Sequence, residues 1–145
     1  MKALFPGSFN PFTKGHADIV ERALKLFDEV VVGIGVNVAK CGRSHEEVQA
    51  HERLKAYYKD NPRVCVTEYS CLTADLCQEL GIGVIVRGVR SVKDFEYERQ
   101  MADVNHQLTG VETVVLFADP VYESLSSSLV RELAAYGRDI STFII

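Results

Sequence analysis

The feature that most constrains the fold of this chain is a series of short apolar runs that lack the polar alternation of a half-exposed β-strand. The runs are rich in β-branched residues and comprise Lys2–Phe5, Glu29–Val36, Val64–Val66, Val84–Val86 and Thr113–Phe117. Strands that are apolar on both sides belong to sheets that are covered on both faces. We therefore expect these runs to form the strands of a buried parallel sheet.

Segments with helical spacing lie between the apolar runs. In the first of them, apolar residues recur at Ile19, Val20, Ala23, Leu24 and Phe27. Further helices are predicted over Glu46–Lys59, Thr73–Leu80, Phe95–Leu108 and Ser127–Tyr136, with Gly137 as a left-handed cap. Because strands and helices alternate along the chain, we expect an α/β fold with a doubly wound parallel sheet.

The composition fits a single domain over residues 1–145. The chain has 145 residues, of which 47% are hydrophobic, and no linker rich in Pro, Gly or Ser divides it. The four cysteines form no C-x-x-C pair and have no histidine at zinc-finger spacing, so we predict no protein-held metal.

The charge and the apolar runs also exclude some classes of partner. A net charge of -4 and a pI of about 5.6 argue against a nucleic-acid partner. No run approaches the roughly 20 apolar residues of a membrane span, and the apolar run among the first residues is too short for a signal peptide. We expect a protein of the reducing cytoplasm that does not enter a membrane.

Ligands of doubly wound sheets bind beyond the carboxyl ends of the strands. Four loops are therefore where we expect a site: those after Phe5, Val36, Val86 and Phe117. The first loop contains Gly7 and Gly15, which allow close backbone approach, and it precedes a helix whose amide-rich start suits an anion. From spacing alone, a phosphate cradle and an ordinary tight turn between strand and helix both remain open.

Three blocks of sequence resemble a known family. They are P-G-S-F-x-P-x-T-x-G-H over residues 6–16, R-G-V-R followed by D-F-E-Y-E over residues 87–98, and S-S-S-x-x-R-E over residues 126–132. The first resembles the T/H-x-G-H signature of the nucleotidyltransferase α/β phosphodiesterase superfamily. All three, with Asn105, are similar to the bacterial phosphopantetheine adenylyltransferase family. Asn10 stands where that family usually has aspartate, which removes a charge beside the nucleotide site.

The resemblance implies a Rossmann-like nucleotidyltransferase fold and an enzyme of coenzyme A biosynthesis. Such an enzyme transfers the adenylyl group of ATP to 4'-phosphopantetheine by direct in-line attack, giving dephospho-CoA and pyrophosphate. It also implies Mg²⁺ bound with ATP, a homohexamer, and coenzyme A as a candidate feedback inhibitor. No catalytic carboxylate pair is expected, because a phosphate with a second pKa of about 6 is already ionised at pH 7.

The resemblance also assigns residues to roles. His16, Lys40 and Arg90 carry over as catalytic, with His16 donating a hydrogen bond to the ATP phosphates in the transition state. By resemblance, the acceptor side comprises Ser8, Lys40, Leu72, Thr73, Arg87 and Asn105. By resemblance, the ATP side comprises Ser8, Phe9, Gly15, His16, Gly88, Val89, Arg90, Glu98, Tyr122, Glu123, Ser124, Leu125, Ser126, Ser127 and Ser128.

Each of these residues also has a simpler interpretation. A lone histidine caps a helix or packs in a core more often than it binds a ligand, and a glutamate in a helix is usually solvated. Because His45, His51 and His106 lack metal-ligand spacing, we expect them at the surface. Two other functions stay open: a sister nucleotidyltransferase with another acceptor, such as nicotinate mononucleotide or a phosphocholine-like phosphate, and a non-catalytic nucleotide-binding module.

Overall fold

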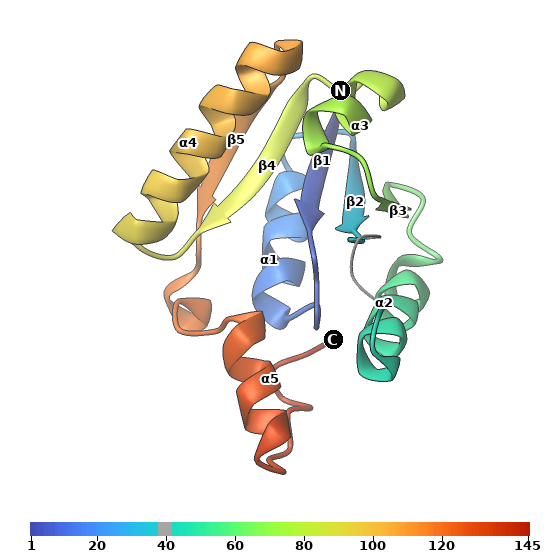
Figure 1. Cartoon of the computed structure of the whole chain (residues 1–145), viewed down its shortest axis with the longest axis vertical. Coiled ribbons are helices and arrows are strands. Elements are labelled where there is room, and N and C mark those ends of the chain that lie inside the picture. Colours follow the sequence, from blue (N-terminus) through green and yellow to red (C-terminus); the bar gives the residue numbers. More distant parts are fainter. Residues whose placement is uncertain (38–41) are drawn as a thin grey trace.

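The computed structural model describes residues 1–37 and 42–145, so Lys40 lies outside the described residues. Five parallel strands form the sheet drawn in Figure 1: β1 (Lys2–Gly7), β2 (Glu29–Gly35), β3 (Val64–Tyr69), β4 (Val84–Val89) and β5 (Glu112–Phe117). The strand order is β3-β2-β1-β4-β5, with β1 at the centre. The doubly wound parallel sheet expected from the apolar runs is confirmed.

This order creates a topological switch point beside β1. The chain moves outward from β1 to β2 and β3, then crosses back so that β4 pairs with the other side of β1, with Leu4 opposite Ile85. Loops that leave the carboxyl ends of β1 and β4 diverge at such a point and leave a crevice between them. The fold therefore places the loops after Gly7 and Val89 at one opening.

The helices connect and cover the strands. Their bounds are α1 (Lys14–Ala23), α2 (His45–Tyr58), α3 (Thr73–Leu80), α4 (Val92–Thr109) and α5 (Ser127–Ala135), with a short 3-10 turn at Pro120–Tyr122. Helix α4 begins three residues earlier than the apolar spacing predicts, because the Ser91 hydroxyl caps it by accepting from the Asp94 amide. Gly137 has a φ of 78°, as its predicted role as a left-handed cap requires.

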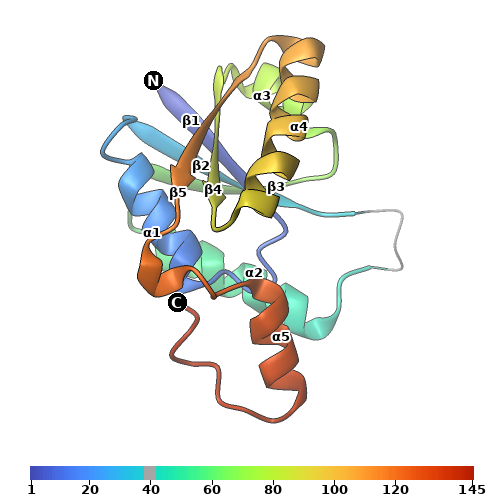
Figure 2. The same ribbon diagram turned by 90° about the vertical axis from the view of Figure 1, so that its left-hand side faces the viewer.

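Alternating strand residues feed two separate cores. Ala3 and Phe5 of β1 point to the face that α1 and α2 cover, whereas Leu4 points to the opposite face, against α3. Figure 2 shows α1 on one side of the sheet and α3 with α4 on the other. Because side chains alternate across a strand, burial on both faces requires apolar residues at every position. This is the physical reason for the unbroken apolar runs.

The expectation that His51 lies at the surface is wrong. Its side chain is fully buried on the inner face of α2, together with Ala50, Leu54 and Tyr58. Those four positions follow helical spacing, so the sequence did contain a signal for the burial of His51. His45 and His106 are exposed, as expected.

The C-terminal segment returns to the start of α1. The Lys14 amide donates to the Phe143 carbonyl at 2.9 Å, and Thr13 forms an antiparallel bridge with Ile144. Ile145 packs against the core shared by α1 and α2. Among the described residues, no helix is long and apolar enough to span a membrane.

Candidate functional site

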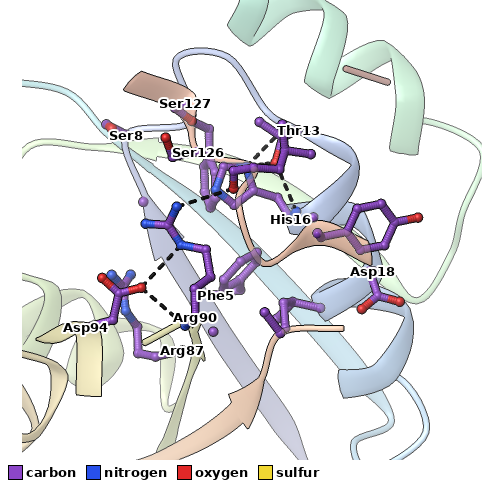
Figure 3. A pocket seen from close by; sticks show the side chains of 18 of the residues that line it. Phe5, Ser8, Thr13, His16, Asp18, Arg87, Arg90, Asp94, Ser126 and Ser127 are labelled. Carbon is purple, nitrogen blue, oxygen red and sulfur yellow. Dashed lines mark hydrogen bonds and ion pairs between the residues drawn. The ribbon is translucent and has the colours of Figure 1, made fainter. Parts of the chain in front are cut away.

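A cavity of about 320 Å³ opens at the carboxyl ends of β1, β4 and β5, between the N-termini of α1 and α5. In Figure 1, α5 lies beyond the tips of the strand arrows, and its residues Ser127, Ser128 and Arg131 line this cavity. Figure 3 shows Ser8, His16, Arg87, Arg90 and Ser127 around it, contributed by elements far apart in the sequence. Two helix N-termini at one cavity present free backbone amides and the positive ends of two helix dipoles, which favours an anion.

Local hydrogen bonds at the start of α1 fix the orientation and tautomer of His16. The Thr13 hydroxyl accepts from the His16 amide, and the Thr13 amide donates to His16 Nδ1 at 2.9 Å, which closes a capping box (Figure 3). Since Nδ1 accepts a hydrogen bond, the proton of the neutral imidazole is on Nε2. His16 therefore brings an Nε2–H donor to the cavity that it lines.

The surroundings of His16 keep its imidazole neutral. The ring packs against Phe9 and Phe12, at centroid distances of 5.1 and 5.2 Å, and lies near Phe5. Burial among these rings, reinforced by the positive charges of Arg87 and Arg90, lowers the pKa of His16 from 6.5 to about 4. At neutral pH this group is a hydrogen-bond donor and not a cation.

Arg87 is held in place by Glu98. Its Nε and Nη2 donate to the two carboxylate oxygens at 2.7 and 2.8 Å, and its Nη1 donates to the Pro6 carbonyl. Glu98 is only 7% exposed, so it is not the solvated glutamate that a helical position favours. A bidentate fork of this kind fixes the guanidinium plane at the edge of the cavity.

Arg90 directly follows Val89, the last residue of β4. Its Nε lies 3.2 Å from Asp94 Oδ2, a carboxylate that also accepts from the Arg90 backbone amide (Figure 3). Its Nη1 donates to the Leu125 carbonyl at 3.3 Å. Asp94 belongs to the D-F-E-Y-E block but was not predicted as a site residue; its spacing of four from Arg90 is the signal that could have indicated it.

Helix α5 is tied to the loop after β1. The Ser127 hydroxyl donates to the Pro11 carbonyl at 2.7 Å, and Arg131 donates to the Asn10 carbonyl. The Ser126 hydroxyl caps the helix by accepting from the Leu129 amide. The serine block thus caps a helix and also lines the cavity, and its role as an anion site stays a prediction.

A second cavity, of about 260 Å³, adjoins the first on the α4 side. The two share Pro6, Gly7, Ser8, Arg87 and Glu98 as lining residues. The rest of the second cavity is lined mainly by larger and partly apolar side chains of β3, α3 and α4: Tyr69, Thr73, Tyr97, Met101, Ala102 and Asn105. A compact polar cavity therefore meets a more apolar one at Ser8 and Arg87.

Most of the residues assigned by resemblance lie together at these cavities. Those that line one or both are Ser8, Phe9, Gly15, His16, Thr73, Arg87, Gly88, Arg90, Glu98, Asn105, Tyr122, Leu125, Ser126, Ser127 and Ser128. Leu72, Val89, Glu123 and Ser124 line neither cavity: Val89 is buried and Leu72 is 61% exposed. Tyr69, Tyr97, Met101 and Arg131 line a cavity without having been predicted.

The carboxylates at the first cavity are largely paired. Asp94 and Glu98 face arginines, and Asp18 lies 3.3 Å from Arg22. Within the described ranges 1–37 and 42–145, no group of three His, Cys, Asp or Glu residues could hold a metal ion. Carboxylates that are already paired with arginines offer few free oxygen ligands to a cation at this cavity.

Comparisons with known proteins place this geometry in a family. The chain matches the cytidylyltransferase-like family over residues 4–133. It is 50% identical over 143 residues to a phosphopantetheine adenylyltransferase of Bacteroides thetaiotaomicron, covering 99% of this chain and 94% of that protein. It is 43% identical over 143 residues to that of Thermobifida fusca, covering 99% of this chain and 87% of the relative.

A solved structure shows the same fold. A chain from Vibrio parahaemolyticus, assigned as a nicotinate-nucleotide adenylyltransferase, superposes with a TM-score of 0.66 and 22% identity over 99% of this chain and 92% of its own length. At that identity the likeness concerns the fold alone. The relatives at 43 to 50% identity match nearly the full length. The chain therefore belongs to the phosphopantetheine adenylyltransferase family.

Proposed function

We propose that this chain transfers the adenylyl group of ATP to 4'-phosphopantetheine, giving dephospho-CoA and pyrophosphate. The observation that carries the proposal is the junction of the two cavities at Ser8, Arg87 and Glu98. The first cavity offers amides, hydroxyls and a histidine donor to a triphosphate. The second has room and apolar walls for an extended pantetheine arm whose phosphate reaches the junction.

The reaction is a displacement at the α-phosphorus of ATP. An oxygen of the 4'-phosphate forms a bond to that phosphorus while the bond to the bridging oxygen of the β-phosphate breaks, and pyrophosphate leaves with the electron pair. Because the attacking phosphate is already ionised, no protein base takes a proton. The contribution of the protein is to align the two phosphates and to stabilise the charge that develops between them.

His16 and Arg90 are the groups we assign to that charge. Neutral His16 donates from Nε2 to a phosphate oxygen of ATP, and the N-termini of α1 and α5 add backbone donors. Arg87, fixed by Glu98, holds the acceptor phosphate at the junction. Lys40, which lies outside the described residues, is assigned to the same phosphate by resemblance. Bound Mg²⁺ would neutralise triphosphate charge while held mainly by ATP oxygens and water.

Finer properties belong to the same proposal. We infer a cytoplasmic, single-domain enzyme of coenzyme A biosynthesis that coenzyme A can inhibit by occupying both cavities. We also infer a homohexamer. Its support is an apolar face on α4, defined by Tyr97, Met101, Val104 and Leu108, which are 39 to 59% exposed; Tyr97 and Met101 also line the second cavity. A chain that leaves so many large apolar side chains on one helix gains stability by covering them.

The test is pyrophosphate release from the purified protein with ATP and Mg²⁺, comparing 4'-phosphopantetheine with nicotinate mononucleotide and choline phosphate. We expect release only with 4'-phosphopantetheine. Release with another acceptor instead would establish a sister transferase. A folded protein that binds ATP yet releases pyrophosphate with none of the acceptors would be a non-catalytic nucleotide-binding module.

A further inference from the structure

Carbonyls at the end of β1 and in the loop between β1 and α1 are bound by side chains from other elements. Arg87 of β4 donates to the carbonyl of residue 6, Arg131 of α5 to that of residue 10, and Ser127 of α5 to that of residue 11. These three side chains line the first cavity and so belong to the site itself. The carbonyl of Ser8 is bound by His51 of α2, which lines neither cavity.

His51 is completely buried and its two ring nitrogens have different partners. Nε2 lies 2.8 Å from the Ser8 carbonyl oxygen, and Nδ1 lies 3.1 Å from Nη1 of Arg43. Arginine can only donate, so Nδ1 is the acceptor and Nε2 carries the proton. Both contacts are satisfied at once by this one tautomer of the neutral ring.

Arg43 connects this imidazole to the edge of the sheet. Its guanidinium also donates to Glu68 of β3, whose carboxylate lies 3.4 Å from Nζ of Lys55 on α2. The chain of contacts therefore runs from β3 through Arg43 and His51 to the Ser8 carbonyl. A buried polar side chain that is fully bonded in this way has one orientation and transmits it to its partner.

The segment that His51 holds is conformationally costly. Phe9, the next residue, has a φ of 45°, in the left-handed region that side chains other than glycine rarely adopt. Its ring covers Gly7 so closely that a Cβ there would lie 2.8 Å from the ring carbons. Such a backbone persists only where its surroundings over-determine it, and the hydrogen bond to the Ser8 carbonyl is one of those constraints.

We propose that His51 is a positioning residue for the adenylyl transfer, which holds the Ser8 backbone at the junction of the two cavities through an Nε2–H donor. The proposal rests on the proposed function. Its consequence is kinetic, because reacting phosphates aligned at that junction lose rate steeply when a positioning group shifts by about 1 Å. His51 does not touch substrate and takes no part in bond making.

A matched pair of variants tests the proposal. In His51→Gln the amide nitrogen reaches the position of Nε2 and keeps the donor, whereas in His51→Asn the amide ends near the position of Nδ1 and cannot reach Ser8. We expect His51→Asn to lower kcat about 10- to 100-fold with a much smaller change in the KM for ATP, and His51→Gln to recover most of kcat. His45→Asn, at the exposed start of the same helix, is the control and should match the wild type.

Hydrogen exchange separates positioning from activity. We expect faster amide exchange over residues 7–12 in His51→Asn than in His51→Gln, with equal exchange over β2.

Equal kcat in the wild type and a folded His51→Asn would overturn the proposal. Equal losses of kcat in His51→Asn and His51→Gln would overturn it too, because they would mean that only packing matters. If His51→Asn does not fold, Arg43→Leu replaces it: a wild-type kcat and wild-type exchange over residues 7–12 would then overturn the proposal. A wild type without transferase activity would refute the proposed function instead, and the exchange comparison would still test the contact.

Discussion

Two histidines of this chain have their tautomer fixed by the protein, for opposite uses. In His16 a backbone amide occupies Nδ1, so the Nε2 proton is left for the cavity. In His51, Nε2–H donates to the Ser8 carbonyl and Nδ1 accepts from Arg43. The same side chain thus presents a donor to the cavity in one place and holds the backbone in the other.

Replacing His16 by alanine should lower turnover by about 100-fold or more, because it removes a donor aimed at developing charge. The KM for ATP should change much less, since the helix N-termini and arginines still bind the phosphates. Pyrophosphate release under saturating substrates measures the effect, with thermal unfolding to show that the variant is folded. Unchanged turnover would remove His16 from the mechanism.

The pKa of His16 also predicts how stability depends on pH. The folded chain binds the proton only near pH 4, whereas the unfolded chain binds it near 6.5. Stability is therefore lost as the pH falls from 6.5 toward 4, by up to about 3 kcal/mol from this group. Urea unfolding of the wild type and His16→Gln at several pH values between these limits measures this. In His45→Gln, at an exposed site, the free energy of unfolding should change with pH as it does in the wild type. The same pH dependence in His16→Gln would contradict the attribution of this effect to His16.

At the scale of elements, the sequence indicated where each strand and helix lies. It did not indicate which side chains of different elements contact one another. Short apolar runs rich in β-branched residues, alternating with segments of helical spacing, favour a sheet covered on both faces, and all five predicted strands are present. The missed features depend on contacts between distant residues: Glu98 with Arg87, and His51 with Ser8. No local pattern reports such pairs, because the partner lies on another element. The residue roles came from the family resemblance and stay predictions.

Glu98 of α4 contributes both to the packing of that helix and, through Arg87, to the geometry of the site. The change Glu98→Gln should lower the free energy of unfolding by about 2 kcal/mol, because Arg87 loses its charged partner in a largely buried place. The loss is moderate because part of the Arg87 side chain is still exposed to solvent. It should also raise the KM for 4'-phosphopantetheine, since the guanidinium is no longer fixed. Urea unfolding and steady-state kinetics measure the two effects. Glu96→Gln, exposed on the same helix, should be neutral, and equal effects of the two changes would contradict this.

At the scale of the whole molecule, the apolar face of α4 starts at the second cavity with Tyr97 and Met101 and continues to Val104 and Leu108, which are 49% and 55% exposed. A charge placed in that face should prevent self-association, because burying it without a partner is costly. We expect Val104→Glu to elute as a smaller species than the wild type in size-exclusion chromatography with light scattering. Leu26→Glu, at a 61% exposed position just after α1, is the control. A wild type that is already monomeric would contradict the proposed assembly.

The contact of residues 143 and 144 with the start of α1 has a consequence for the order of synthesis. The ribosome makes the T-x-G-H segment first, and the strand-like partner of Thr13 and Lys14, at residues 143 and 144, follows only after all five strands have been made. A nascent chain can therefore complete this corner of the first cavity only after residue 144 has emerged from the ribosome. For the same reason, removing residues 143 and 144 would take away the backbone partners of Thr13 and Lys14 at the start of the helix that carries His16.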